Sequence, residues 1–131
     1  NELHYRINQT LDLEVMNEAA QLLLQYEDFE CFSKSKTDVK TFLCNIHQAR
    51  WSRTEKGYIF TISANRFLRN MVRAIVGTLL EIGLKKKAIA DLDRIIQLKK
   101  RSEAGYSVPA QGLFLTAITY PEDIFIEAWQ K

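Results

Sequence analysis

The chain is organised around the stretch from Arg66 to Gly83, which reads RFLRNMVRAIVGTLLEIG. At about 100° per residue, most of its apolar side chains fall on one broad face of a helix. That face contains Leu68, Met71, Val72, Ile75, Leu79 and Ile82, widened by Phe67, Val76 and Leu80. We therefore predict a long, mostly buried helix over residues 66–83. Its opposite side would carry a narrow strip made of Arg66, Arg69, Asn70, Arg73 and Gly77.

Arg73 has no acidic residue one turn away in this predicted helix. The corresponding positions are Arg69, Asn70, Val76 and Gly77, so a partner for its guanidinium must come from elsewhere. Arginine offers a rigid fork that suits a carboxylate or a phosphate, and Gly77 would let a backbone or a ligand come close. Two interpretations stay open here, an intramolecular ion pair beside a packing glycine and a functional site.

The residues before this stretch predict a helix and a hairpin. After a short possible strand at Leu3 to Ile7, Asp12 is a suitable N-cap for a helix from about Leu13 to Tyr26, whose apolar stripe indicates packing. Two strands are expected at residues 44–51 and 58–64, joined by a turn-rich linker. In the second strand one face gathers Tyr58, Phe60, Ile62 and Ala64.

The residues after this stretch predict a second helix and a last strand. Gly83 is expected to end the first helix as a left-handed cap, and a helix with one apolar seam follows from about Ile89. The strand from Leu113 to Tyr120 is apolar on both faces over its first half, which is typical of a strand at the centre of a covered sheet. The fold class predicted is α+β.

A Ser-, Thr- and Lys-rich loop lies between the first helix and the hairpin. Lys34, Lys36 and Lys40 flank its hydroxyl side chains, and such residues can bind phosphates without reading sequence. Phe29 and Phe32 could stack on a base or anchor the loop in the core. On local evidence a solvated basic loop with two core phenylalanines is the favoured interpretation.

Composition narrows the class of protein. At 131 residues, 47% hydrophobic, the chain is long enough for one domain with a sizeable core. Its net charge of +2 does not by itself indicate a nucleic-acid binder. A zinc site built from Cys31, Cys44, His47 and His4 lacks the usual ligand spacing, so we expect no metal. No apolar run approaches the roughly 20 residues that span a bilayer, and a cytoplasmic protein is expected.

Two sequence blocks resemble the C-terminal half of the tRNA pseudouridine synthase A (TruA) family. They are ANRFLRNMVRAIVGTLLEIG at Ala64–Gly83 and AQGLFLTAITYPEDIF at Ala110–Phe125. A looser block, MNEAAQLLLQYEDFECFSKSKTD at Met16–Asp38, is similar to the family's equivalent region. Together the blocks indicate that residues 1–131 form a C-terminal half, and the absence of an initiator Met at Asn1 is expected for a piece of a longer protein.

The resemblance implies a mixed, largely antiparallel sheet with packed helices and an RNA-binding cleft. It implies isomerisation of uridines on the 3′ side of the tRNA anticodon arm, without a cofactor, by a homodimer that grips tRNA. In that family an Asp nucleophile detaches uracil from its ribose, and the base rotates and is rejoined through carbon. Such a step needs an ionised, well-placed carboxylate.

Carried over by position, Arg73 matches the family's arginine that pairs with the catalytic Asp. Leu113 matches the leucine that packs against the target base. The resemblance also implies that Arg66, Arg69 and Asn70 lie near the RNA, although family members often have His where this chain has Asn70. With Lys34 and Lys36 of the basic loop, these residues form the predicted RNA-binding set.

The family's nucleophile motif, Gly-Arg-Thr-Asp-Ala-Gly, is absent from this sequence. The segment around Asp38, Lys-Thr-Asp-Val-Lys, lacks both glycines and occupies the position of a different loop, so we reject Asp38 as nucleophile. We therefore expect no catalytic nucleophile in this chain, an inactive isolated chain, and the missing N-terminal half as its partner. The alternative is a stand-alone RNA-binding or dimerisation module without a catalytic half.

Overall fold

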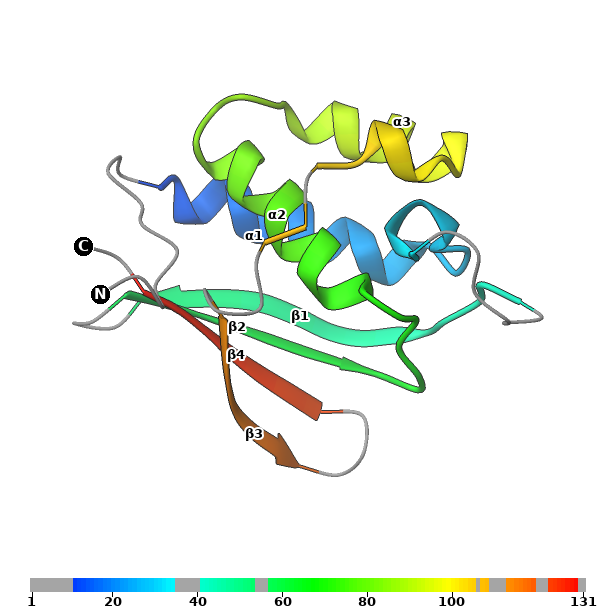
Figure 1. The fold of residues 1–131 in the computed structure, drawn as a ribbon. Coiled ribbons are helices and arrows are strands. Elements are labelled where there is room, and N and C mark those ends of the chain that lie inside the picture. The colour runs from blue at the N-terminus through cyan, green and yellow to red at the C-terminus, as the bar shows by residue number, and fades with distance from the viewer. Residues whose placement is uncertain are drawn as a thin grey trace.

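The computed structural model describes residues 11–34, 41–53, 57–105, 107–108, 113–119 and 123–129. The possible strand at Leu3–Ile7 lies outside the described residues. The helices and strands follow one another along the chain (Figure 1) as α1 (Leu13–Leu22), β1 (Ile46–Arg53), β2 (Gly57–Ala64), α2 (Met71–Gly83), α3 (Ile89–Leu98), β3 (Leu113–Thr119) and β4 (Asp123–Trp129). Within the described ranges, short 3-10 turns also occur as η1 (Leu23–Gln25), η2 (Glu30–Phe32) and η3 (Arg101–Glu103).

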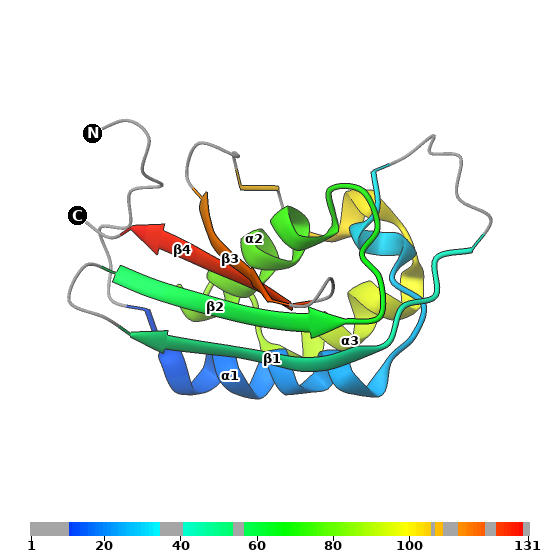
Figure 2. The same ribbon diagram turned by 90° about the horizontal axis from the view of Figure 1, so that it is seen from below.

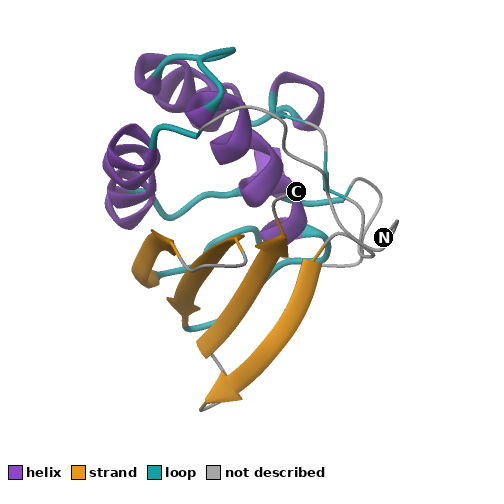
Figure 3. Ribbon diagram, turned by 90° about the vertical axis from the view of Figure 1, so that its left-hand side faces the viewer, coloured by secondary structure: helices purple, strands orange, loops and turns teal. Residues whose placement is uncertain are grey.

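The strands form one four-stranded sheet in the order β1-β2-β4-β3. Every neighbouring pair is antiparallel, and the three helices lie on one face of the sheet (Figures 1 and 3). No helix among the described residues covers the other face, which is turned to the viewer in Figure 2. The predicted α+β class, with packed helices on an antiparallel sheet, is confirmed. The sheet was expected to be mixed, but no parallel pair occurs among the described strands.

The core lies between the sheet and the helices. The predicted face of β2 is buried there, with Tyr58, Phe60, Ile62 and Ala64 at 1% exposure or less. Trp51 of β1 stacks on Phe60, with ring centroids 4.8 Å apart. Since side chains alternate along a strand, one face of the hairpin meets the helices and the other carries more exposed residues such as Arg50 and Ser52.

Helix α1 begins as predicted and covers the edge of the sheet. The Asp12 carboxylate accepts a hydrogen bond from the Val15 backbone N–H at 3.1 Å, which confirms it as the N-cap. Asn17 pairs with the backbone of Trp51, accepting from its N–H at 2.6 Å and donating to its carbonyl at 3.1 Å. Side-chain amides thus satisfy backbone groups at the open edge of β1, a position that would otherwise invite pairing with another chain.

The predicted helix over 66–83 is too long at its start, because α2 begins at Met71. Asn70 adopts a left-handed backbone conformation with φ 69°, which no α-helix can continue through. Arg66 and Arg69 therefore lie in the segment before the helix, so the predicted strip of arginines three and four residues apart on one helix is wrong. Gly77 is buried and does not belong to an exposed strip.

The predicted left-handed cap at Gly83 is also wrong. Gly83 is the last helical residue, and the left-handed residue is Lys85, with φ 68°. Gly83 is required for clearance instead, because a Cβ at this position would lie 2.8 Å from Met16 Cγ and 3.2 Å from Leu11 Cδ2. The glycine allows the end of α2 to pack directly against α1.

The two C-terminal strands differ from the sequence-based expectation. β3 is the strand predicted from Leu113, but among the described strands it lies at the end of the sheet and not at its centre. β4 was not predicted, although its sequence DIFIEAW alternates Ile124, Ile126 and Ala128 with Phe125, Glu127 and Trp129. That alternation is the signal that could have revealed the strand.

In the described part of the chain, every helix is too short or too polar to span a bilayer.

Introducing a side chain at Gly83 is expected to destabilise the fold. Gly83→Val should lower the free energy of unfolding by about 1–3 kcal/mol, the usual cost of overpacking, as measured by urea denaturation. The double variant Gly83→Val/Met16→Ala provides the control, because the smaller side chain makes room for Val. Its loss of stability should be smaller than the sum of the two single losses, and simple additivity would contradict the proposed clash.

Asp12 is expected to make a pH-dependent contribution to stability. Lys85 Nζ lies 2.7 Å from its carboxylate, and this hydrogen bond, with that from Val15, lowers the pKa of Asp12 from its ordinary value of 3.8. A lowered folded-state pKa means that the contribution is fully present above 3.8 and is lost as the pH falls through the folded-state value.

The matched change is Asp12→Asn, because Asn remains a good N-cap but has no charge. In urea denaturation the wild type should be the more stable at neutral pH, and the difference should shrink below pH 3.8. Glu18→Gln, at an exposed position of the same helix, controls for the loss of a negative charge. A stability difference for Asp12→Asn that is independent of pH would rule out the ion pair as its cause.

Candidate functional site

Arg73 is exposed in the first turn of α2. Its Nε donates a hydrogen bond to the Val108 carbonyl at 2.8 Å, and its own carbonyl accepts from the Val108 N–H at 3.2 Å. Among the described residues no carboxylate lies within ion-pair distance of its guanidinium, and its two Nη groups make no hydrogen bond there. The intramolecular ion pair that the sequence left open is therefore not found among the described residues, and the two Nη groups of Arg73 face no partner there.

The segment that leads to β3 is attached to the start of α2. Asn70 Nδ2 donates to Ser107 Oγ at 2.6 Å, so consecutive residues Ser107 and Val108 are bound by Asn70 and Arg73, which lie three positions apart. Sequence reasoning missed this contact, because Ser107 gives no local signal. Leu113 follows five residues after Val108 along the chain and begins β3, opposite Ala128 of β4.

A backbone hydrogen bond joins two loops that carry predicted RNA-binding residues. The Lys34 N–H donates to the Arg69 carbonyl at 3.1 Å. Arg66 Nη1 donates to the carbonyls of Thr41 and Leu43, at 3.1 and 3.0 Å. We call the surface of these loops that carries Lys34, Arg66 and Arg69 the basic loop surface. Lys34 and Arg69 are exposed in it, whereas Arg66 is half-buried and holds its neighbouring loop in place; Lys36 and Asp38 lie outside the described residues.

The two phenylalanines of the basic loop belong to the core. Phe29 and Phe32 have no exposed surface, and their rings stack with centroids 6.4 Å apart. The placement of both phenylalanines in the core is confirmed, so neither ring is available to stack on a base. The rest of the basic loop, residues 35–40, lies outside the described residues.

The cysteines behave as core residues. Cys31 is fully buried and Cys44 is 1% exposed, and burial raises the pKa of Cys31 to about 12. Burial also raises the pKa of the Cys44 thiol. Within the described residues no cluster of His, Cys, Asp and Glu could hold a metal ion; His4 of the conceivable zinc set lies outside them.

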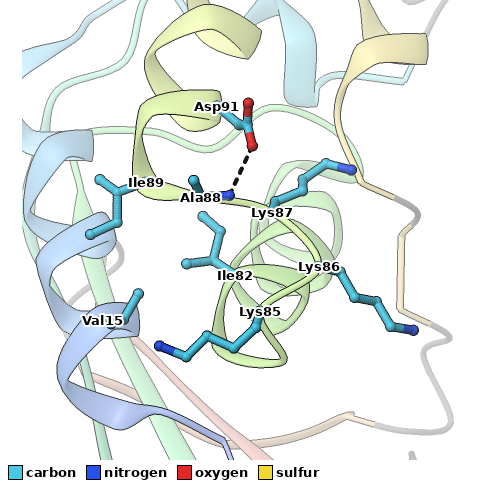
Figure 4. A pocket seen from close by; sticks show the side chains of 8 residues that line it. All are labelled: Val15, Ile82, Lys85, Lys86, Lys87, Ala88, Ile89 and Asp91. Carbon is cyan, nitrogen blue, oxygen red and sulfur yellow. Dashed lines mark hydrogen bonds between the residues drawn. The ribbon is translucent and has the colours of Figure 1, made fainter.

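A pocket of about 430 Å³ lies at the other end of α2, where the loop to α3 passes α1 (Figure 4). Three lysines line it, but two of them are already paired, Lys85 with Asp12 at 2.7 Å and Lys87 with Glu81 at 3.2 Å. The Asp91 carboxylate accepts from the Ala88 N–H at 2.8 Å and so occupies the start of α3. Most of these charges are thus paired, with Lys86 the exception among the described ion pairs, and the pocket is not part of the Arg73 site.

The fold and the site together define an α+β domain that carries an exposed arginine and a basic loop surface at one end of its central helix. A family model described as tRNA pseudouridine synthase matches residues 19–121. Since this match includes most of the chain, the chain belongs to the tRNA pseudouridine synthase family.

The relatives that match the chain are named tRNA pseudouridine synthase A, in agreement with the resemblance found in the sequence. The protein from Bacteroides thetaiotaomicron is 50% identical over 133 residues, which cover 99% of this chain and 49% of that protein. The one from Parabacteroides distasonis is 51% identical, with 95% and 50% covered. The one from Bacillus licheniformis is 39% identical, with 88% and 47% covered. The chain thus spans about half the length of these relatives.

The buried cysteines are expected to be inert in the folded protein. Only the thiolate reacts rapidly, and both thiols combine burial with a raised pKa. A chromogenic thiol reagent at mildly alkaline pH should therefore modify neither Cys31 nor Cys44 until the chain is unfolded in guanidinium, where both should react. Rapid modification of a Cys44→Ser variant before unfolding would show that Cys31 is accessible and contradict its placement in the core.

Proposed function

We propose that this chain is the C-terminal half of a tRNA pseudouridine synthase and works only together with its N-terminal half. Membership of the family, a match to about half the length of each relative, and an exposed arginine fork support this proposal. The sequence lacks the family's Gly-Arg-Thr-Asp-Ala-Gly motif, so the nucleophile is assigned to the other half. The substrate proposed is a uridine on the 3′ side of the tRNA anticodon arm.

In the proposed reaction the nucleophilic Asp of the N-terminal half attacks the ribose carbon that bears uracil, and the bond between that carbon and the uracil nitrogen breaks. The rotated base then attacks the same ribose carbon through a ring carbon and displaces the Asp carboxylate, after which the proton of that ring carbon is lost and the freed ring nitrogen is protonated. Arg73 pairs with that Asp. A guanidinium beside a carboxylate favours its ionised form and orients it through two parallel hydrogen bonds. The bond from Nε to the Val108 carbonyl at 2.8 Å supports this role, because it restrains the guanidinium while leaving both Nη groups to face a partner.

Leu113 and the basic loop surface would bind the substrate. We assign packing against the target base to Leu113, at the beginning of β3. Lys34, Lys36, Arg66 and Arg69 would contact phosphates. Binding of this kind weakens steeply with salt because it releases counterions. Asn70 is also expected near the RNA. Because its amide is bonded to Ser107 at 2.6 Å, we assign Asn70 a supporting position next to the basic loop surface.

The N-terminal half would complete the sheet. β3 has no neighbour on its outer side among the described strands, although its sequence LFLTAIT is apolar on both faces over its first half. An open, apolar edge strand is a template for pairing with another strand. We propose that the other half covers this edge, and that two complete copies grip tRNA as a homodimer.

The proposal is tested by reconstitution. Pseudouridine formation in tRNA is measured with this chain alone, with the N-terminal half alone, and with the two mixed. Activity only in the mixture supports the assignment of the nucleophile to the missing half. Activity of this chain alone would mean that Asp38 was rejected wrongly, and a mixture that binds tRNA without modifying it would favour the non-catalytic module.

Arg73 should be required for turnover in the complete enzyme. Arg73→Ala should lower kcat by about 100-fold or more, the scale seen when a charge-stabilising group is removed from an active site, with little change in tRNA affinity. Arg94→Ala is the matched control, because Arg94 is an exposed arginine of α3 that pairs with Asp91 and Glu103, and it should retain full activity. An unchanged kcat in Arg73→Ala would contradict the proposed pairing of Arg73 with the nucleophilic Asp.

A further inference from the structure

The hydroxyl of Ser107 joins three separate elements of the fold. It accepts hydrogen bonds from Asn70 Nδ2 and from Arg101 Nη2, both at 2.6 Å. Asn70 precedes α2, Arg101 begins η3 after α3, and Ser107 lies on the segment that leads to β3. Arg101 also donates through Nη1 to the Gly105 carbonyl at 2.9 Å, so the same guanidinium holds this segment at two points.

The residue after Ser107 is the one that binds Arg73. Val108 is fully buried and exchanges two hydrogen bonds with Arg73, one to the backbone and one from Nε. A serine and a valine in sequence are thus bound to the N-cap and to the first turn of the same helix. Displacement of Ser107 would move the Val108 carbonyl, which is the acceptor that orients the Arg73 guanidinium.

The backbone conformation of Asn70 is unusual. Its φ of 69° lies in the left-handed region, which is uncommon for residues other than glycine but is tolerated by Asn. Glycine would adopt this conformation more readily, but it has no amide to reach Ser107. Asn70 therefore combines a left-handed backbone with a side-chain amide that binds Ser107.

We propose that Ser107, held by Asn70 and Arg101, is a positioning residue that sets the orientation of Arg73 towards the nucleophilic carboxylate. This inference rests on the function proposed above. Ser107 touches neither the substrate nor the reacting atoms in this assignment; it acts through Val108 and Arg73. Its loss should therefore reduce the rate of the chemical step more than the binding of tRNA.

The first test uses steady-state kinetics of the complete enzyme. Ser107→Ala and Asn70→Gly, which keeps the left-handed backbone, should each lower kcat by about 10- to 100-fold, the effect of a small misplacement of a catalytic group. For Ser107→Ala, KM for tRNA should stay within about twofold, because Ser107 contributes nothing to the binding of tRNA in this assignment. Ser107→Thr keeps a hydroxyl and should retain kcat within about threefold. Ser102→Ala, at an exposed serine of η3, is the matched control and should be neutral.

The second test measures directly whether the Arg73 guanidinium is hydrogen-bonded. Exchange of the Arg73 Nε–H with water is followed by nitrogen NMR on the complete enzyme, with Arg73→Lys identifying the signal. Exchange should be slow in the wild type and Ser102→Ala, and faster in Ser107→Ala and Asn70→Gly, because a hydrogen-bonded N–H is protected.

An unchanged kcat in Ser107→Ala, or an unchanged exchange rate in both variants, overturns the proposal. A fall in thermal stability with no selective loss of kcat overturns it as well, because that result indicates a merely structural contact. If the wild-type enzyme forms no pseudouridine in tRNA, the proposed function fails, and the exchange rates alone then support or overturn the positioning of Arg73.

Discussion

The burial of α2 is the constraint on which the rest of the structure depends. Ten of its residues are buried, so the helix is enclosed on almost its whole circumference by the sheet and the neighbouring helices. Such a helix needs small side chains where it touches others closely, as at Gly83 beside Met16. Its polar groups need internal partners, and Thr78 Oγ1 accordingly donates to the Ala74 carbonyl at 2.9 Å and accepts from Gly105 N–H at 2.9 Å.

Because α2 is enclosed, only one part of it can present a functional side chain at the surface. Of its residues, all of which are described, Arg73 alone is exposed. A functional group carried by this helix can therefore be presented only in its first turn, next to the left-handed Asn70 and the basic loop surface. A rigid, buried helix is a good support for such a group, because a site carried on a regular element is held more accurately than one on a loop.

One edge and one face of the sheet are covered by helices, whereas the other edge and the other face are open among the described residues. α1 satisfies the edge of β1 with the amides of Asn17 and Gln21, and the helices cover one face. The edge of β3 and the second face have no such cover among the described residues. This asymmetry agrees with a chain that spans half the length of its relatives, and in the proposed enzyme the open side is where the other half and the tRNA are received.

The elements of the core could be predicted because their signals are local. Apolar residues recur at helical or alternating spacing, and this recurrence predicted α1, the hairpin and most of α2, each with an apolar face. The resemblance to the family likewise rested on contiguous blocks of sequence. The cap at Asp12 was predictable for the same reason, since its acceptor lies three residues from the N–H that it binds.

Contacts between distant residues decided the rest. The start of α2 depends on the left-handed backbone of Asn70, whose amide binds a serine 37 positions away, and helix periodicity carries no information about such a bond. The same holds for the loops that meet at Lys34 and Arg69 and for the place of β3 at the end of the sheet. The sequence by itself determined which faces of α1 and of the hairpin are buried, because that is set by spacing along the chain. The tertiary structure alone decided how Arg73 is oriented and which basic residues surround it, because these follow from hydrogen bonds between segments that the chain order keeps apart.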